Sequence, residues 1–182
     1  MGPGSERTFE DFVERRMMSL FGAAYLLVGD VHQAEDLLQA ALEKVYRRWR
    51  RIETMDHPEA YVRRVIVNLA NDRWRRRGRA VEVAIDEAET ASHPDDTDLI
   101  DLRQELIGGL QKLPIGMRTV LVLRYWEGLT DAQVAAELGR SVGTVKSQAS
   151  RGLERLRGLA DRRHGAARDA APTRADRGSG ED

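Results

Sequence analysis

Apolar residues recur at helical spacing along most of this chain, and no segment shows the alternating pattern of a β-strand. In residues 31–50, for example, apolar side chains return every three or four positions, which places them on one face of a helix. The same spacing predicts further helices over residues 9–29, 60–77, 99–113, 115–127, 131–138 and 142–157. The sequence therefore predicts an all-α fold.

The charged residues divide the chain into blocks, although the formal net charge of its 182 residues is only −1. Residues 1–80 carry 15 basic and 12 acidic side chains, and residues 106–164 carry ten basic and five acidic ones. Between these blocks, residues 81–105 carry one arginine and nine acids. This asymmetry is typical of polyanion-binding lobes joined by a solvated segment, and ordinary solvated helix faces are the alternative.

The charge blocks and the helical spacing together predict where the domains begin and end. We expect two small helical domains, over residues 6–79 and 99–164. Residues 80–98 lack a helical pattern and are rich in acids, which predicts a flexible acidic linker. Residues 165–182 are mostly alanine, glycine and charged residues, which predicts a disordered tail.

Several classes of protein are excluded or disfavoured. The chain has no cysteine, so disulfides, thiolate metal sites and cysteine nucleophiles are excluded. No apolar run has the length of a membrane span and no signal peptide is visible, so we expect a cytoplasmic protein without membrane association. The motifs of metalloproteases, phosphate-binding loops and nucleophile elbows are absent, which argues against an enzyme and against a bound cofactor. The polar group of Asp30, His32, Glu35 and Asp36 indicates the first turn of a helix rather than a metal site.

Residues 130–157 contain a short helix, a turn with glycine and a longer helix, the most specific pattern in the chain. Thr130 and Ser141 are suitable N-caps, and Gly139 is a suitable C-terminal stop. The pattern predicts a helix-turn-helix whose second helix enters the major groove of DNA, with a plain helical hairpin as the alternative. The polar residues opposite or beside the apolar stripe of that helix are of the types that contact bases and phosphates. They are Thr144, Lys146, Ser147, Gln148, Ser150 and Arg151.

Helix 60–77 carries a second polar stripe, opposite its apolar face. The stripe consists of Arg64, Asn68, Asn71 and Arg75, with Trp74 beside it. Basic side chains interleaved with amides are suited to a phosphate backbone and to exposed bases, and a tryptophan off the core face is suited to stacking on a base. The stripe therefore indicates a surface for single-stranded nucleic acid, and a solvated helix with a basic C-terminal end is the alternative.

Helix 31–50 carries a third polar stripe, formed by Asp36, Gln39 and Glu43. An acidic surface of this kind is suited to basic side chains of a protein partner. Simple solvation of the helix is the alternative, because exposed acidic stripes are common on soluble helices.

Together these motifs resemble bacterial sigma factors of the extracytoplasmic-function group, within the sigma-70 family. The segment GDVHQAEDLLQAAL resembles region 2.2, and PEAYVRRVIVNLANDRWRRR resembles the helix that melts and reads the −10 promoter element. The segment from Leu113 to Arg157 resembles region 4, which reads the −35 element. Within that segment, RYWEGLTDAQVA and SVGTVKSQASR are similar to an actinobacterial SigE-like subfamily. The resemblance covers residues 9–160 and includes the order of the two lobes.

The resemblance implies a function and a set of partners. A member of this family binds core RNA polymerase, through the β′ clamp and the β flap, and directs promoter-specific initiation of transcription without itself being an enzyme. It contacts both double- and single-stranded promoter DNA, and an anti-sigma factor is a further partner compatible with the family. The acidic linker is expected to thread toward the active site of the polymerase, where its charge imitates nucleic acid.

The resemblance also implies roles for particular residues. Asp36, Gln39 and Glu43 are expected to contact the polymerase, and the stripe around Asn68 is expected to meet the melted −10 strand. The polar face of helix 142–157 is expected to contact the −35 duplex. A loop before helix 60–77 is expected to hold a base flipped out of the DNA stack. Its residues are Ile52, Glu53, Thr54, Met55, Asp56 and His57.

One other class of protein accounts for part of the pattern. LuxR-like regulators carry a similar helix-turn-helix and bind duplex DNA without first binding the polymerase. Their first domain is a sensor or receiver, usually with strands, whereas residues 6–79 of this chain are expected to be helical. The first lobe is therefore the part of the molecule that separates the two interpretations.

Overall fold

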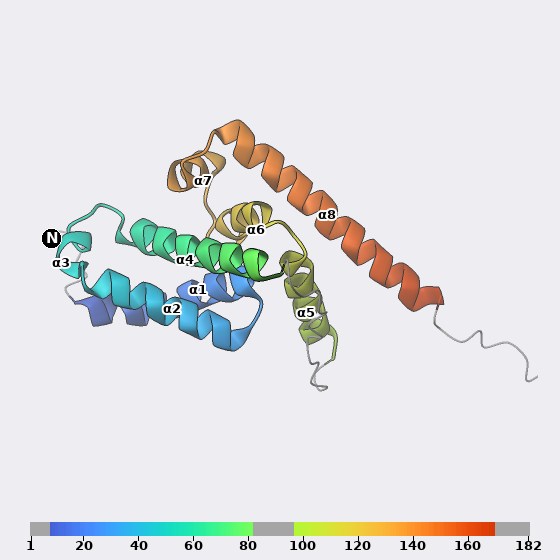
Figure 1. The fold of residues 1–182 in the computed structure, drawn as a ribbon, viewed down its shortest axis with the longest axis horizontal. Coiled ribbons are helices and arrows are strands. Elements are labelled where there is room, and N and C mark those ends of the chain that lie inside the picture. The colour runs from blue at the N-terminus through green and yellow to red at the C-terminus, as the bar shows by residue number, and fades with distance from the viewer. Residues whose placement is uncertain (1–7, 82–96, 170–182) are drawn as a thin grey trace, which may run out of the picture.

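The computed structural model describes residues 8–81 and 97–169, with side chains described for 8–76 and 102–162. Every regular element within these ranges is a helix. In chain order they are α1 (Phe9–Val28), α2 (Val31–Tyr46), α3 (Trp49–Ile52), α4 (Pro58–Val81), α5 (Thr97–Gln111), α6 (Ile115–Leu121), the π-helix η1 (Val122–Trp126), α7 (Asp131–Leu138) and α8 (Val142–Asp169). The described residues thus confirm the all-α prediction, with α1–α4 in the first lobe and α5–α8 in the second (Figure 1).

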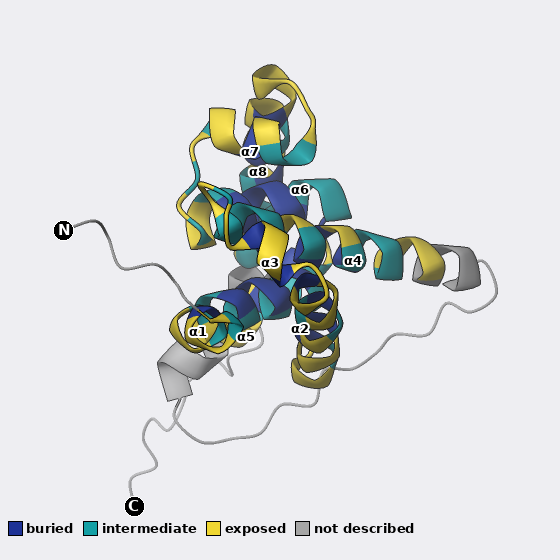
Figure 2. Ribbon diagram, turned by 90° about the vertical axis from the view of Figure 1, so that its left-hand side faces the viewer, coloured by how far each residue is buried: buried dark blue, intermediate teal, exposed yellow. Residues whose placement is uncertain are grey.

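The first lobe is a bundle in which α1, α2 and α4 surround a common apolar core (Figure 2). Phe12, Leu37, Val62 and Ile66 are each at most 1% exposed. They are the apolar faces of their three helices, and burying one such side chain stabilises the fold by about 1.5–3 kcal/mol. Gly29 makes the tight connection between α1 and α2, because its φ of 80° lies in the left-handed region.

The loop expected before helix 60–77 is partly helical. Trp49–Ile52 form the short helix α3, and Ile52 is only 1% exposed. Trp49 packs on Phe9 and Phe12, with ring centroids 5.4 and 5.0 Å away. Ile52 is therefore buried in the core and is not exposed in the loop that was predicted to hold a flipped base. Trp49 and Ile52 thus continue the core after α2 ends. The polar residues around them give the segment the sequence pattern of a loop.

The second lobe contains the predicted helix-turn-helix, α7 and α8. A capping box begins α7, because Thr130 Oγ1 accepts a hydrogen bond from the Gln133 N–H at 3.3 Å and Gln133 Oε1 accepts one from the Thr130 N–H at 2.8 Å. Gly139 ends α7 with a φ of 62°. Ser141 Oγ then accepts a hydrogen bond from the Thr144 N–H at 3.1 Å at the start of α8. These caps fix the turn between the two helices.

Some helix ends differ from the predicted ones. Helices α4 and α8 continue to Val81 and Asp169, whereas the apolar pattern ended at 77 and 157. The sequence has no periodic apolar pattern in these last turns, so the pattern ended before the helices do. Accordingly, α4 and α5 include both ends of the predicted linker, and α8 includes the start of the predicted tail. Residues 82–96 and 170–182 lie outside the described residues, so the flexible linker and the disordered tail stay predictions.

The two lobes pack directly on each other, with η1 and α5 against α1 and with α6 and α7 against α4. Trp126 Nε1 donates a hydrogen bond to the carbonyl of Ser19 at 3.0 Å. Its indole lies so close to Gly22 that a Cβ at that position would collide with the ring. Gln111 Nε2 donates to the carbonyl of Leu26 at 3.1 Å. Glycine in α1 therefore makes room for an aromatic side chain of the other lobe.

Arg118 is a buried link between the lobes, with only 4% of the residue exposed. Its guanidinium donates hydrogen bonds to four backbone carbonyls at the C-terminal ends of two helices. These are Leu27 in α1 and Leu110, Gln111 and Leu113 at the end of α5. Neither α1 nor α5 has a basic residue in its last turn, so Arg118 supplies the cation that the negative ends of both helix dipoles favour. Burial lowers the pKa of Arg118 to about 10, and the side chain remains charged at neutral pH.

Candidate nucleic-acid interface

The outer side of α8 presents the polar residues that the helix-turn-helix pattern predicted. Val145 and Ala149 are at most 1% exposed and pack inward, which fixes the rotation of the helix. The predicted contact residues lie on the remaining surface of its first turns. Thr144, Lys146, Ser147, Ser150 and Arg151 are exposed, and Gln148 is half-buried. The structure thus brings the six predicted residues onto one accessible surface.

Arg140 is a residue of this surface that the sequence pattern missed. It is exposed in the turn before α8, and its Nη1 donates a hydrogen bond to Gln148 Oε1 at 2.6 Å. The contact orients the Gln148 amide and adds a positive charge beside the N-terminus of α8. The one signal in the sequence is a basic residue immediately before the N-cap Ser141.

The stripe on α4 faces away from the core of the first lobe. Arg64, Asn68 and Arg75 are exposed, Trp74 is 45% exposed, and Asn71 is half-buried. Arg75 forms an ion pair with Asp72 one turn earlier in the helix. Arg64 lies at the N-terminal end of the stripe and donates to the carbonyl of Ala136 in α7 at 3.4 Å. The stripe is therefore accessible along α4, and at its N-terminal end Arg64 also contacts the second lobe.

The loop between α3 and α4 adjoins this stripe, because it leads directly into the first turn of α4. Glu53, Thr54, Asp56 and His57 are exposed there. Thr54 Oγ1 donates to the carbonyl of Arg51 at 2.9 Å, which closes a compact turn. Met55 is half-buried and packs against the core, so it contributes to the base of the loop rather than to its tip.

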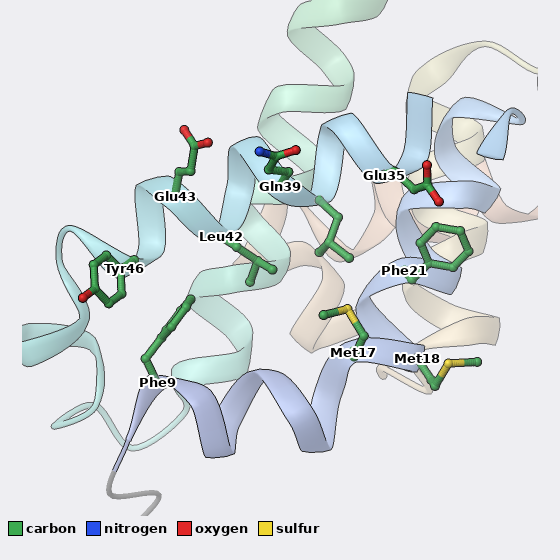
Figure 3. A pocket seen from close by; sticks show the side chains of 10 residues that line it. Phe9, Met17, Met18, Phe21, Glu35, Gln39, Leu42, Glu43 and Tyr46 are labelled. Carbon is green, nitrogen blue, oxygen red and sulfur yellow. The ribbon is translucent and has the colours of Figure 1, made fainter. Parts of the chain in front are cut away.

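An open apolar groove of about 560 Å³ lies between α1 and α2 (Figure 3). Its apolar lining includes Phe9, Met17, Met18, Phe21, Leu42 and Tyr46. Two of the three predicted partner-contact residues, Gln39 and Glu43, line the same groove, and Glu35 lies on that α2 side as well. Asp36 is exposed but does not line it. Apolar side chains left open to solvent beside carboxylates are typical of a surface that binds another protein. We call this surface the α1–α2 groove.

The polar group at the start of α2 has a structural role. Asp30 Oδ1 accepts a hydrogen bond from the Gln33 N–H at 2.9 Å and so caps the helix. His32 and Glu35 lie 3.5 Å apart and are largely exposed. The described parts of the chain contain no group of three or more side chains that could hold a metal ion. None of the helices in those parts has the length and apolar character of a membrane span.

Two protein-family models match the chain, one on each lobe. The model of Sigma-70 region 2 matches residues 12–80, which lie in the first lobe. The model of Sigma-70, region 4 matches residues 103–156, which include the helix-turn-helix.

Relatives match the chain across both lobes. The RNA polymerase sigma-E factor of Streptomyces avermitilis is 40% identical over 157 residues, which cover 86% of this chain and 87% of that protein. The ECF RNA polymerase sigma factor SigW of Bacillus subtilis is 29% identical over 85% of this chain and 89% of that protein. A solved structure of the sigma factor RpoE from Bartonella quintana, in complex with the anti-sigma factor NepR, is 27% identical. It matches with a TM-score of 0.69 over 84% of this chain and 98% of that one.

Two helical lobes, each with an exposed polar face and each matched by its own family model, define an RNA polymerase sigma factor, and the chain belongs to the sigma-70 family. Within that family it is an extracytoplasmic-function sigma factor similar to sigma-E of Streptomyces. It associates with core RNA polymerase and directs the initiation of transcription, and it is not itself an enzyme. The match over the first lobe excludes the LuxR-like alternative.

Proposed function

We propose that the polar face of α8 reads the −35 promoter element as duplex DNA and that the stripe on α4, with the loop before it, binds the melted −10 strand. The observation that carries this proposal is that each lobe turns one polar face away from its own core. Run-off transcription with core polymerase from a Streptomyces species tests it on genomic fragments. We expect start sites that appear only when the protein is added. No new start site, together with a shift of duplex DNA by the protein alone, would overturn the proposal.

The chemistry of the α8 face supports contact with duplex DNA. Arg151 has the paired donors that match the edge of guanine in the major groove, and the amide of Gln148 matches adenine. Lys146 and the hydroxyl side chains are suited to phosphate oxygens, which position a helix without specifying sequence. Arg140 adds charge at the end of α8 that enters the groove first.

The chemistry of the α4 stripe supports contact with a single strand. Asn68 and Asn71 offer donors and acceptors to the edges of unpaired bases. Trp74 offers a half-exposed indole ring, and base stacking on such a ring contributes about 1–3 kcal/mol. The exposed side chains of the loop, from Glu53 to His57, line the place where a flipped base would lie, and the buried Ile52 supports the loop from beneath.

The α1–α2 groove supports a docking site for core polymerase on the first lobe. We assign to it the β′ clamp, with apolar side chains of the clamp against Met17, Phe21 and Leu42, and basic ones near Gln39 and Glu43. Asp36, exposed outside the groove, extends the acidic rim. The second lobe would contact the β flap, so that the polymerase holds both lobes at a fixed spacing. Two weak DNA contacts then act together, because the second one is intramolecular.

Replacing Asn68 with alanine should reduce the fraction of open promoter complexes about fivefold at limiting holoenzyme. The change removes one amide from an exposed helix face, and a hydrogen bond to a base is worth about 1 kcal/mol. Permanganate footprinting of the −10 region on a duplex promoter measures the opening. Gln104→Ala is the matched control, because it removes an exposed amide from α5, away from the proposed interface. Equal opening by Asn68→Ala and the parent protein would contradict the role of Asn68.

Reversing the charge of Glu43 with lysine should weaken binding to core polymerase about tenfold at low salt. The carboxylate stands at the solvent-exposed rim of the groove, where such charges mainly accelerate association with a basic partner. The difference should shrink as the salt concentration rises, because the charge is screened. Fluorescence anisotropy of labelled protein titrated with core polymerase measures the affinity. Asp161→Lys makes the same reversal near the far end of α8, and an equal loss from both variants would argue against a specific contact.

An anti-sigma factor is a further partner that we propose, because the Bartonella quintana relative is bound to one in its solved structure. We also propose that the acidic linker is flexible and enters the polymerase, and that the protein acts in the cytoplasm. Residues 82–96 of that linker lie outside the described residues.

A further inference from the structure

Arg140 and Gln148 form a hydrogen-bonded pair on the α8 face, next to the start of α6. Arg140 lies in the turn before α8, and Gln148 lies about two turns into that helix. Nη1 of Arg140 donates to Oε1 of Gln148 at 2.6 Å. Arg140 is exposed, whereas Gln148 is half-buried. We call these two side chains the Arg140–Gln148 pair.

The first turn of α6 makes room for this pair because it carries Gly116. A Cβ built on Gly116 would lie 3.3 Å from both Arg140 Nη1 and Gln148 Nε2, which is closer than ordinary van der Waals contact. One turn further along α8, Gly152 lies against α6, where a Cβ would be 3.0 Å from Cδ1 of Leu121. The two helices thus approach each other closely, and α6 backs one side of the pair.

The hydrogen bond within the pair changes what Gln148 can offer to DNA. A free glutamine amide matches adenine, because its oxygen accepts from N6 and its nitrogen donates to N7. In the structure Oε1 already accepts from a charged donor, and such hydrogen bonds are stronger than neutral ones. An adenine amino group would have to approach that oxygen beside a guanidinium, which is itself only a donor. The groups left for a base are therefore donors, namely Gln148 Nε2 and the other N–H groups of Arg140.

A set of donors selects a base that presents acceptors. In the major groove guanine presents two acceptors, O6 and N7, whereas adenine presents one acceptor and one donor. Cytosine presents a donor, and thymine presents a single acceptor beside its methyl group. Guanine is therefore the base whose edge best matches the pair.

We propose that Arg140 and Gln148 act as one unit that selects guanine over adenine at one position of the −35 element. Gln148 Nε2 and a guanidinium N–H of Arg140 donate to the two acceptors of that guanine. The hydrogen bond between the side chains keeps the Gln148 oxygen from the base, and the missing side chain at Gly116 lets the unit lie against α6. This inference rests on the proposed function of the α8 face and deepens it, because it names the base that the pair selects.

Competition binding of the holoenzyme tests the pair. The probes are a promoter found by run-off transcription and its single-base-pair variants in the −35 element. The parent holoenzyme should prefer guanine over adenine at one position by about tenfold, as expected for a contact with two hydrogen bonds. Arg140→Ala frees the Gln148 oxygen, so the guanine preference at that position should disappear or change to adenine. Arg140→Lys keeps a donor for that oxygen and should retain a preference for guanine.

Two further variants separate base selection from a general loss of affinity. Gln148→Glu still accepts from Arg140 but exchanges the Nε2 donor for an acceptor, so it should abolish the guanine preference at the same position. Arg162→Ala removes an equal charge from an exposed site near the far end of α8, and it should leave the base preference unchanged. Circular dichroism of each variant verifies that it is folded.

The same guanine preference in the parent and in Arg140→Ala would overturn the inference, because the hydrogen bond would then have no effect on base selection. A parent that prefers adenine at the position altered by Gln148→Glu would overturn it as well. A holoenzyme that discriminates at no position of the −35 element would contradict the proposed function of the α8 face itself. The two failures are therefore distinguishable in one set of measurements.

Discussion

Replacing Arg118 with methionine should lower the free energy of unfolding by about 3–5 kcal/mol, because several buried carbonyls lose a charged hydrogen-bond donor at once. Methionine has a similar length but donates no hydrogen bond. Four backbone carbonyls at the ends of α1 and α5 would then lose the guanidinium as a donor, in a site that is 4% exposed. The Leu110 carbonyl would keep the hydrogen bond from the Leu113 N–H, so the main loss falls on the other carbonyls. Each buried acceptor left unpaired costs about 1–3 kcal/mol, and water entering the site would recover part of the loss.

Urea unfolding followed by circular dichroism measures the effect on Arg118→Met. Arg157→Met is the matched control, because Arg157 is exposed on α8 and its replacement should change the free energy of unfolding by less than about 0.5 kcal/mol. A loss below about 1 kcal/mol for Arg118→Met would contradict the role given to its carbonyl contacts. The loss of stability should affect both lobes, because Arg118 lies in α6 and also binds a carbonyl in the last turn of α1.

The helices and the polar faces could be predicted from the sequence because local spacing determines both. Val145 and Ala149 establish which side of α8 packs inward, and the opposite side then follows from the rotation of the helix. The same reasoning places Asn68 opposite Val62 and Ile66 on α4. Capping chemistry is also local, and Thr130, Gly139 and Ser141 act as their residue types predict.

Contacts between the lobes could not be predicted in this way, because they join residues far apart in the chain. Ser19 and Glu127 are 108 positions apart, and nothing around either one indicates its partner. An arginine on a short helix is ordinarily expected to face solvent, so the burial of Arg118 has no local signal. Ile52 illustrates the same limit at short range, since its neighbours suggest a loop while its side chain fills the core.

The packing of the lobes also limits what the exposed surfaces can do in the free protein. The α8 face and the α1–α2 groove are exposed to solvent in the structure, whereas the α4 stripe contacts the second lobe through Arg64. Promoter binding by the isolated protein is expected to be weak for two reasons, namely the few phosphate contacts of each lobe and the contact between them.

Replacing Arg151 with alanine should weaken promoter binding by the holoenzyme by about 1–3 kcal/mol, which corresponds to roughly 5- to 150-fold in the dissociation constant. Arg151 is exposed on the outer side of α8, two turns after the helix begins, where a recognition helix still lies within the major groove. Its planar guanidinium can donate two hydrogen bonds to one guanine, a contact that alanine cannot replace. The loss should therefore depend on the base pair at one position of the −35 element.

Competition binding of the holoenzyme to a promoter and to its single-base-pair variants in the −35 element separates the two ways in which Arg151 could act. If Arg151 reads a base, the parent holoenzyme discriminates at one position and the Arg151→Ala holoenzyme does not. A uniform loss across all templates, with a smaller salt dependence, would instead identify a phosphate contact. Arg155→Ala removes an exposed arginine one turn further along α8, beyond the turns that enter the groove, and should have little effect on discrimination. Unchanged binding and discrimination by Arg151→Ala would exclude Arg151 from the interface and shift the assignment of base reading toward Gln148 and Arg140.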